Sequence, residues 1–549
     1  MFNIRKWFST SKTPQSEPIP GSTQVPNSAG GYSFEVNDWM RLDRFLILGT
    51  EGGSYYATEQ KLTRESAEAV LRCIQADGSR AVACIARISK EGRAPKNDPA
   101  IFALAMAAKL GDEATRKAAG QALPEVCRTG THLMHFAEFA EGFGGWGRGL
   151  RGAVGRWYND KPASELAYQL VKYQSRDGWS NRDLLRLAHP KAKTPDHQAL
   201  FAWATRGSLP AEVPSALAII EAVERAKKAT TVNEIVALIR THDLPRECVP
   251  TQLLTHAPVW EALLERMPFT ALIRNLATMT RVGLLAPMAP ATAEVVRRLE
   301  DEAGLIKARV HPVQVLAALM TYKSGKGVRG NGTWSPASAV VDALDAAFYK
   351  AFRAVEPSNT KTLLALDVSG SMSGGTVAGV PGLTPRVASA AMALVTAATE
   401  KQHEFVAFTN GLTELDISPR QRLDDICART AAMPFGGTDC ALPMLWAKER
   451  KLEVETFIVY TDSETWAGKI HPVQALADYR RESGIPAKLI VVGLVANKFS
   501  IADPKDAGML DVVGFDTASP ALIADFARLR PNKGRQDKNQ KGHPYRGEV

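Results

Sequence analysis

Apolar residues recur at helical spacing from about Tyr32 to about Gly325. They return every three or four positions, the spacing that places them on one face of an α-helix. Clear examples are 213–228, 232–240 and 292–307, and short breaks rich in proline, glycine and polar residues separate such segments. The pattern predicts an α-solenoid of paired helices. No strict sequence repeat is present, so an irregular all-helical domain is the alternative.

Local signals mark where several of these helices begin and end. Asp98 and Pro99 precede an apolar run that stops at Gly111, as expected for an N-terminal cap, a first-turn proline and a C-terminal glycine. Ser180 stands three residues before Asp183, the spacing of a capping box. These residues predict helices that begin near 98 and near 181.

The pattern changes after about residue 358. Short apolar runs bounded by turns alternate with helical segments at 386–401 and 471–483. The apolar runs are TLLALD (362–367), EFVAF (404–408), TFIVYTD (456–462) and KLIVVGLV (488–495). Strands that are apolar on both faces and alternate with helices predict a parallel sheet covered by helices, a doubly wound α/β domain.

Length and composition divide the chain further. The 549 residues are too many for one compact core. Residues 9–31 are rich in serine, threonine, proline and glycine, which is typical of a flexible segment. We therefore predict a flexible N-terminal segment (1–31), a helical domain (32–357), an α/β domain (358–530) and a basic mobile tail (531–549).

Hydropathy and the spacing of the cysteines indicate the cellular compartment of the protein. There is no run of eighteen apolar residues, and the first ten residues, MFNIRKWFST, are too polar for a signal peptide. The six cysteines contain no CxxC pair, which argues against a zinc ribbon or a dithiol site. We expect free thiols in a cytoplasmic protein without a membrane anchor.

Hydroxyl and carboxyl side chains gather where three predicted strands and loops end. Asp367, Ser369 and Ser371 follow the first strand of the α/β domain, Thr438 lies in a glycine-rich loop, and Asp462 ends another strand. In doubly wound sheets such loops meet at the carboxyl edge. Hard oxygen ligands suit magnesium or a similar divalent ion. The alternative is that these residues only cap helices and form turns.

An enzyme with an aspartate nucleophile or two metal ions is also considered. A phosphatase of this kind needs a second acid two positions after Asp367, where Ser369 stands, and no histidine lies nearby in sequence. Paired carboxylates for two-metal hydrolysis are also missing. The residue pattern therefore disfavours catalysis.

Positive charge is concentrated at the front of the chain. Lysine and arginine exceed aspartate and glutamate by nine over 1–350, whereas 351–527 has a net charge of −5 and 528–549 of +5. The densest basic segment, 172–193, has six basic residues against two aspartates, with Tyr173 and Trp179 between them. Such a segment suits RNA recognition through backbone and shape. A solvated helix surface explains the pattern equally well.

Two histidines, His132 and His135, lie three residues apart in THLMHFAEF. With Glu138 they could in principle bind a metal ion. No other carboxylate stands at ligand spacing in the sequence. We expect a structural role for both.

Several segments of the chain resemble known protein families. The DxSxS sequence at 367–371 with Thr438 and Asp462 resembles the metal-ion-dependent adhesion site of von Willebrand factor A-like (vWA) domains. Segments spread from about Gly31 to about Arg528 resemble the Ro autoantigen family, whose helical part is the TROVE module. They are RFLILGTEGGSYY (44–56), EVCRTGTH (125–132), GWGRGLR (145–151), DGWSNRDLLRLAH (177–189), KARVH (307–311), ALDAAFY (343–349), GGTDC (436–440) and IADP (501–504).

The resemblance implies a HEAT-like helical ring closed by the vWA domain. Family members are noncatalytic proteins that bind Y RNA on the outer surface and single-stranded 3′ ends of misfolded RNA through the central hole. In bacterial relatives Y RNA tethers the protein to polynucleotide phosphorylase. The resemblance assigns RNA binding to Lys172, Arg176 and His189. Asn181 departs from relatives, which often have histidine there.

The resemblance also implies how the metal site works. Ser369, Ser371 and Thr438 would touch the ion, and Asp367 and Asp462 would bind it directly or through water. One coordination position would remain for a partner's carboxylate. A magnesium-dependent protein-interaction scaffold is therefore the alternative function. We expect a protein monomer within the ribonucleoprotein.

Overall fold

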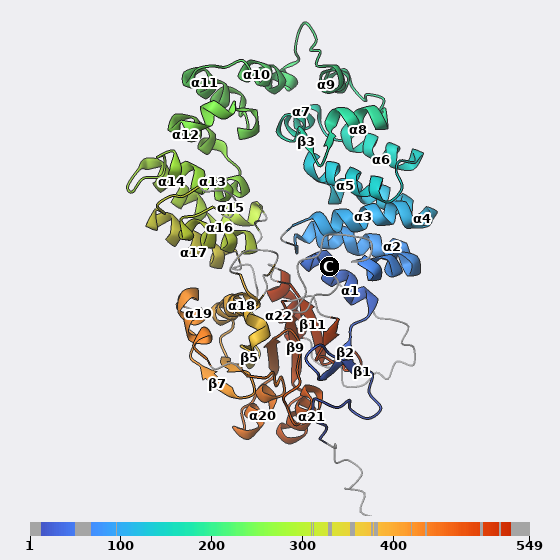
Figure 1. Cartoon of the computed structure of the whole chain (residues 1–549), viewed down its shortest axis with the longest axis vertical. Helices are drawn as coiled ribbons and strands as arrows, with labels where there is room; N and C mark the ends of the chain where they lie inside the picture. Colours follow the sequence, from blue (N-terminus) through green and yellow to red (C-terminus); the bar gives the residue numbers. More distant parts are fainter. Residues whose placement is uncertain are drawn as a thin grey trace, which may run out of the picture.

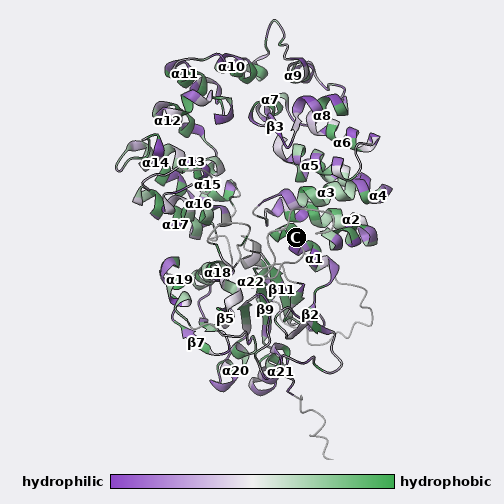
Figure 2. Cartoon of the chain, viewed as in Figure 1, coloured by the Kyte–Doolittle hydropathy of each residue, from purple (hydrophilic) through white to green (hydrophobic). Residues whose placement is uncertain are grey.

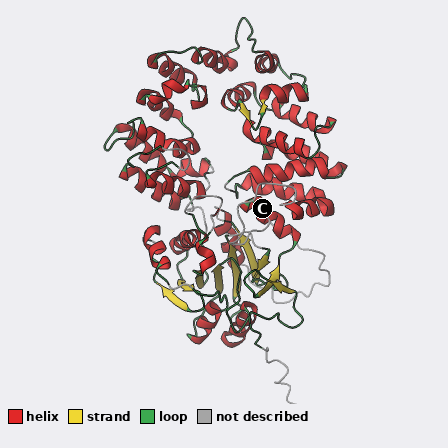
Figure 3. Ribbon diagram, viewed as in Figure 1, coloured by secondary structure: helices red, strands yellow, loops and turns green. Residues whose placement is uncertain are grey.

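The larger sheet of the molecule lies in one domain, together with helices of its own, and most other helices lie outside it. Figure 3 shows the helices in two columns and the larger sheet in the domain below them. The computed structural model describes residues 12–49, 67–94, 96–308, 310, 312–327, 332–351, 357–374, 377, 383–418, 420–433, 436–494, 498–514 and 518–528. The predicted tail, 531–549, lies outside these residues.

The first helical column rises away from the vWA-like domain (Figure 1). Neighbouring helices pack face to face, α2 on α3 and α4, and α3 on α5. Its elements are α1 (Asp38–Leu48), α2 (Glu68–Glu91), α3 (Asp98–Leu110), α4 (Glu113–Val126), α5 (Gly130–Gly142), α6 (Arg148–Asn159), α7 (Ala163–Lys172), β3 (Ser175–Arg176), β4 (Trp179–Ser180), α8 (Asn181–Ala188) and α9 (Pro195–Arg206).

The second column returns to the same domain on the other side (Figure 1). Its elements are α10 (Ala218–Ala226), α11 (Val232–His242), η4 (Arg246–Cys248), α12 (Ala257–Arg266), α13 (Phe269–Arg281), α14 (Pro290–Leu299), α15 (Glu302–Lys307), α16 (Pro312–Ser324) and α17 (Ser338–Lys350). Among the described residues, no helix is long and apolar enough to cross a membrane. The two columns and the domain between their ends form a ring.

Helix ends largely follow the capping signals. The capping box of Ser180 and Asp183 is formed, because each side chain bonds the other residue's backbone N–H. Gly111 ends α3, as predicted. The start of α3 differs by one residue: Asn97 is the cap and Asp98 lies inside the first turn. There its charge still favours the helix N-terminus.

The strands of the vWA-like domain form a six-stranded sheet in the order β11-β9-β8-β5-β6-β7. All neighbours run parallel except β6 and β7. Figure 2 shows hydrophobic colouring on central strands around β9. The strands are β5 (Thr362–Asp367), β6 (His403–Phe408), β7 (Leu412–Leu415), β8 (Thr456–Tyr460), β9 (Lys488–Gly493) and β11 (Met509–Val513).

Helices cover both faces of this sheet, as in doubly wound folds. Residues of β5 alternate between two apolar clusters: Leu364 and Leu366 pack on one face, and Leu363 and Ala365 on the other. The helices are α18 (Pro385–Thr399), α19 (Leu423–Ala431), α20 (Leu442–Glu449), α21 (Pro472–Ser483) and α22 (Ala518–Arg528). The sequence predicted the four central strands and missed β7 and β11, which lie at the sheet edges.

The vWA-like domain contacts both ends of the helical ring. At one end, Arg44 of α1 pairs with Asp511 of β11 at 2.7 Å, and both side chains are buried. At the other end, Lys323 of α16 pairs with Asp424 of α19 at 2.7 Å, and both side chains are about half exposed. The first junction therefore contains a buried ion pair, whereas the ion pair at the second junction is exposed.

The N-terminal segment is built into the vWA-like domain. The sequence predicted a flexible segment over 1–31, but residues 12–31 pack against that domain. Strand β1 (Gln24–Pro26) pairs with β2 (Tyr32–Glu35), which pairs with β10 (Phe499–Ser500). The fully buried Gln15 bonds Asp439 at 2.7 Å and the carbonyl of Ile470 at 2.9 Å. Composition missed this anchoring because the partners lie more than 400 residues away.

The six cysteines form no disulfide in the structure. Four are buried, and Cys84 and Cys427 are half-buried. Burial raises the pKa of the Cys427 thiol to about 11. The Cys427 thiol therefore stays protonated at neutral pH.

Candidate functional site

The carboxyl end of β5 presents Asp367 at the edge of the sheet. Its side chain is fully buried. One carboxylate oxygen accepts a hydrogen bond from the backbone N–H of Ser369 at 2.9 Å, and the other accepts from the hydroxyl of Thr461 at 2.6 Å. The loop after β5 and the loop after β8 therefore hold this carboxylate in place from two sides.

The two serines after Asp367 and the aspartate after β8 lie next to one another. The hydroxyl oxygens of Ser369 and Ser371 are 3.1 Å apart. Ser371 is hydrogen-bonded to the side chain of Asp462. Asp462 also accepts a hydrogen bond from the backbone N–H of Glu464 at 3.0 Å. Hydroxyl and carboxylate oxygens from two strand ends thus converge.

The loop that contains Thr438 is tied to the same edge. The carbonyl of Thr438 accepts hydrogen bonds from the backbone N–H groups of Trp466 and Ala467, at 3.0 and 3.1 Å. Asp439 donates its N–H to the carbonyl of Thr409, directly after β6. The structure therefore places all five predicted metal-site residues on neighbouring loops at the carboxyl edge.

Electrostatics at this edge favour a bound cation. Burial, and then repulsion from Asp462, raises the pKa of Asp367 to about 7. Burial also raises the pKa of Asp462. Two buried carboxylates so close are costly unless positive charge neutralises them. Among the described residues, no three His, Cys, Asp or Glu side chains could hold a metal ion, so any ion would depend on the hydroxyls.

Two polar side chains near the edge were not predicted. The Oγ of Ser373 and the Oε1 of Glu464 are buried without a hydrogen-bond partner among the described residues. Burial, then the charges of Asp462 and Asp367, raises the pKa of Glu464 to about 7. Glu464 could have been found from the sequence, because it lies only two residues after Asp462. Unsatisfied oxygens and crowded carboxylates fit a hard divalent cation.

A buried arginine donates hydrogen bonds to the loop after β5, which contains Ser369. Arg386 of α18 donates to the carbonyls of Val368 and Ser369, at 2.5 and 3.3 Å. Burial lowers the pKa of its guanidinium, and the charge of Asp367 opposes that effect. Nothing in the local sequence marks Arg386 for this role, because it contacts the loop only after α18 has packed on the sheet.

The predicted RNA-binding residues lie on α7, the β3–β4 hairpin and α8. Lys172 ends α7, and its Nζ lies 5.3 Å from the ring centroid of Tyr168 and 5.6 Å from that of Tyr173. Arg176 lies in β3, and its side chain is 59% exposed. His189 is the exposed C-cap of α8, with φ of 45°. An eight-residue helix is about 12 Å long, so His189 lies at the end of α8 that is farther from the hairpin.

The hairpin that carries Arg176 is held by α5. Its turn residue Asp177 has φ of 50°, and its carboxylate contacts Nδ1 of His135. Trp179 donates its indole N–H to Glu138 at 3.1 Å. Trp179, which lies between the basic residues of 172–193 in the sequence, is therefore part of the contact that holds the hairpin on α5.

The two histidines have the structural roles expected of them. Asp98 lies 3.7 Å from the other ring nitrogen of His135, opposite Asp177. The sequence spacing suggested no such carboxylates, because both come from other elements. Burial lowers the pKa of His132 to about 4, so this side chain is neutral near pH 7.

Asn181 also supports the hairpin. It is 6% exposed, accepts a hydrogen bond from the hydroxyl of Tyr158 at 2.9 Å and donates to the carbonyl of Tyr173 at 2.7 Å. These bonds tie α6, the end of α7 and the start of α8 together. The residue that departs from the family pattern is thus a buried structural link.

Sequence reasoning missed the basic face of α6. Arg148, Arg151 and Arg156 are exposed, and α6 contains no aspartate or glutamate. Helix α6 packs beside α8, where Arg182 and Arg186 are also exposed. The available signal was the run RGLRGAVGR (148–156), which has three arginines and no acidic residue. The two helices together form a basic surface.

The fold and both sites define a two-module protein, and the comparisons give the family. Residues 25–321 match the TROVE domain, and residues 361–527 match the Ro60 vWA domain. The chain belongs to the Ro60 family of TROVE-domain proteins.

Its similarity to individual relatives extends over nearly the full length. It is 46% identical to the RNA-binding protein RO60 of Deinococcus radiodurans, over 96% of this chain and 99% of the relative. It is 38% identical to the RNA-binding protein RO60 of Caenorhabditis elegans, over 92% of this chain and 90% of the relative. The crystal structure of the Deinococcus radiodurans RO (RSR) protein matches with a TM-score of 0.71 and 47% identity, covering 90% of this chain and 99% of that one.

Proposed function

We propose that this chain is a noncatalytic RNA-binding protein that acts in RNA quality control, processing or degradation. The observation that carries the proposal is the basic surface of α6, the hairpin and α8, which a rigid helical scaffold presents. Exposed arginines and lysines on such a scaffold bind phosphates and fix the register of RNA. The relatives named as RNA-binding proteins support the same function.

The finer proposal concerns the RNA itself. Y RNA binds the outer basic surface through Lys172, Arg176 and His189, and single-stranded 3′ ends of misfolded RNA enter the ring. A structured RNA with two faces then joins the ring to an exoribonuclease, polynucleotide phosphorylase. The protein works in the cytoplasm as a single copy within the ribonucleoprotein.

The proposed metal ion is magnesium at the edge of the vWA-like sheet. Ser369, Ser371, Thr438, Asp367 and Asp462 would hold it. A bound ion there would supply positive charge between the buried carboxylates and could attract an acidic group from outside. The donor set and the raised pKa of Asp367 support this assignment.

A gel shift with Y RNA at fixed ionic strength tests the RNA site. We expect the double variant Lys172→Ala, Arg176→Ala to bind at least about tenfold more weakly, because two phosphate contacts are lost. A matched control is Lys448→Ala, Arg450→Ala at the C-terminal end of α20. Arg450 is 58% exposed, close to the exposure of Arg176, and lies in the other domain.

Unchanged binding by the α7–hairpin variant would refute that site assignment. Equal losses in both variants would indicate only nonspecific charge attraction. Misfolded RNA with a single-stranded 3′ tail should bind more tightly than the same RNA with a blunt end. Equal binding would contradict entry of 3′ ends into the ring.

A second candidate is a magnesium-dependent protein-interaction scaffold. The buried carboxylates and hydroxyls at the sheet edge favour it, because a hard cation there could bind a partner's carboxylate. Pulldown after nuclease treatment, with and without chelator, separates the two functions. Partners that survive nuclease but are lost with chelator support the scaffold, whereas partners lost with nuclease support RNA binding.

A further inference from the structure

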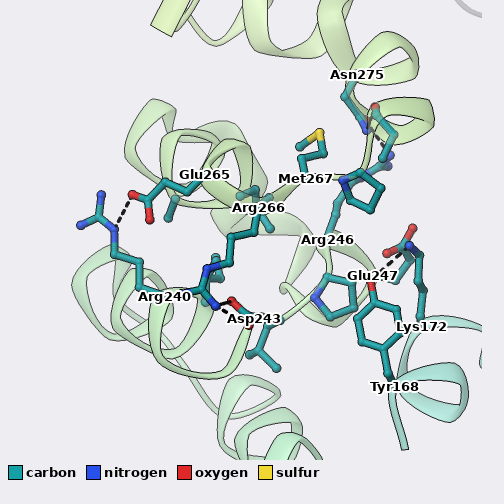
Figure 4. Close-up of a pocket in the computed structure, with 17 residues that line it drawn as sticks. Tyr168, Lys172, Arg240, Asp243, Arg246, Glu247, Glu265, Arg266, Met267 and Asn275 are labelled. Atoms are coloured by element: carbon teal, nitrogen blue, oxygen red, sulfur yellow. Dashed lines mark hydrogen bonds and ion pairs between the residues drawn. The ribbon is translucent and has the colours of Figure 1, made fainter. Parts of the chain in front are cut away.

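A cavity of about 220 Å³ lies between α7 and the opposing elements η4, α11, α12 and α13. Figure 4 shows Tyr168 and Lys172 of α7 on one side, facing Arg246, Met267 and Asn275 across the cavity. It is smaller than the ~300–1,000 Å³ pockets that bury drug-sized ligands. A single planar ring is therefore a better match than a larger ligand.

The walls combine apolar surface with an aromatic ring. Leu263, Met267, Pro268 and Ala271 line the apolar side, and Tyr168 contributes its half-exposed ring. Bases that are not paired commonly stack on aromatic side chains. The composition of the walls suits a nucleobase.

The charges at the rim are not equivalent. Arg240 pairs with Glu265 at 2.9 Å, and Arg266 pairs with Asp243 at 2.5 Å. Lys172, by contrast, has no carboxylate of a described residue within ion-pair distance, although the charge of Glu247, which also lines the cavity, acts on its ammonium. Its ammonium lies at the cavity rim beside Tyr168, where it could bind the phosphate of a nucleotide whose base occupies the cavity.

A buried amide reaches the opposite wall. Asn275 is 6% exposed, donates to the carbonyl of Ala271 at 2.8 Å and accepts from Arg246 at 3.1 Å. A side-chain amide has two donor hydrogens and two acceptor positions, so one of each remains for the edge of a base. Arg246 is itself held 5.8 Å from the ring centroid of Trp260. The hydrogen-bonding groups are therefore preorganised.

We propose that this cavity binds the base of one unpaired nucleotide in an RNA that lies on the basic surface. Tyr168 stacks on the base, Asn275 contacts its edge, and Lys172 binds the adjoining phosphate. This inference rests on the proposed RNA-binding function. A charged surface alone would bind fully paired RNA and RNA with an unpaired nucleotide equally well. The cavity would let the protein distinguish the two.

Fluorescence anisotropy with two labelled RNA hairpins tests the proposal. One stem is fully paired, and the other has the same sequence with a single extra unpaired nucleotide. We expect the wild-type protein to bind the second stem about tenfold more tightly, as one stacked base would give. Ala271→Leu fills the cavity and should abolish this preference while the paired stem still binds.

Ala277→Leu is the matched control. It lies on α13 and is half-buried like Ala271, but does not line the cavity, so it should retain the preference. Asn275→Ala leaves the cavity open but removes the amide, so it should also reduce the preference for the stem with the unpaired nucleotide. Circular dichroism verifies that each variant folds. The cavity assignment would be overturned if the wild-type protein bound both stems equally, or if Ala271→Leu still preferred the stem with the unpaired nucleotide. Either result would leave the RNA-binding function itself intact. If neither stem binds, the RNA-binding function fails and this inference with it.

Discussion

Arg44 and Asp511 form a buried ion pair, 2.7 Å apart, across the junction of the first ring helix and the last strand of the vWA-like sheet. The two residues are 467 positions apart in the chain. Arg44 also donates to the carbonyl of Phe499, and Asp511 accepts from the hydroxyl of Ser500. The closure of the ring at this end therefore depends on a buried ion pair whose two partners are each held by a further hydrogen bond.

Asp511→Ala should strongly destabilise the protein. It would leave the guanidinium of Arg44 buried without its partner, a change that costs roughly 3–5 kcal/mol. Thermal unfolding followed by circular dichroism measures the effect. Asp424→Ala at the other junction is the control, because its exposed pair with Lys323 is worth less than about 1 kcal/mol. Similar losses in both variants would show that burial does not distinguish the two contacts.

Asp367→Asn should stabilise the metal-free protein at neutral pH. Burial and Asp462 raise the pKa of Asp367 from 3.8 to about 7. The folded state therefore holds the proton more tightly than the unfolded chain, so stability falls as pH rises from about 4 to about 7. Asparagine does not ionise, so the variant should not lose stability in this way as pH rises. In chelator at pH 8 we expect the Tm to rise by about 2 °C or more.

The same variant should lose its response to magnesium. Metal ligands must be deprotonated, so magnesium should raise the Tm of the wild-type protein more at pH 8 than at pH 6. Asp367→Asn should show no magnesium-dependent shift at either pH. A Tm rise with magnesium that survives this substitution would place the ion elsewhere.

Gln15→Ala should release the N-terminal segment. This buried side chain bonds Asp439 and the carbonyl of Ile470, and it accepts from the N–H of Gly468 at 3.1 Å. Its loss leaves several buried polar groups unsatisfied, each at a cost of about 1–3 kcal/mol. Limited proteolysis should then cleave within 12–31 much faster than in wild type. Gln24→Ala, at a half-exposed site, should have a smaller effect.

Arg148→Ala with Arg151→Ala should weaken RNA binding through phosphate contacts. Each lost contact lowers the slope of log K against log salt by about 0.7–0.9, so the double variant should lose roughly 1.4–1.8 from the slope. Binding measured across a salt series gives this value directly. An unchanged slope would exclude α6 from the RNA-binding surface, whatever the effect at one salt concentration.

Local sequence was sufficient where neighbours along the chain decide the structure. The capping box of Ser180 and Asp183 formed as predicted, because both partners lie within one turn. The central strands were predicted from their apolar runs, since a strand covered on both faces must be apolar throughout. The positions of Asp367 and Asp462 at strand ends followed from the same pattern.

Long-range packing decided what the sequence could not. Residues 12–31 have the composition of a flexible segment but are anchored through Gln15 to partners far along the chain. Arg386 and Glu464 reach the carboxyl edge only when α18 and the loop after β8 have each packed beside the loop after β5. The cavity between α7 and α13 likewise needs two distant segments.

The sequence by itself determined the helical and α/β modules, the strand-end oxygens and the excess of basic charge, because periodicity and spacing are local properties. Tertiary structure alone decided how the ring closes, which arginines share a surface and which carboxylates are buried together. Those features depend on desolvation and on contacts between residues remote in sequence, and their energies arise only when the chain has folded.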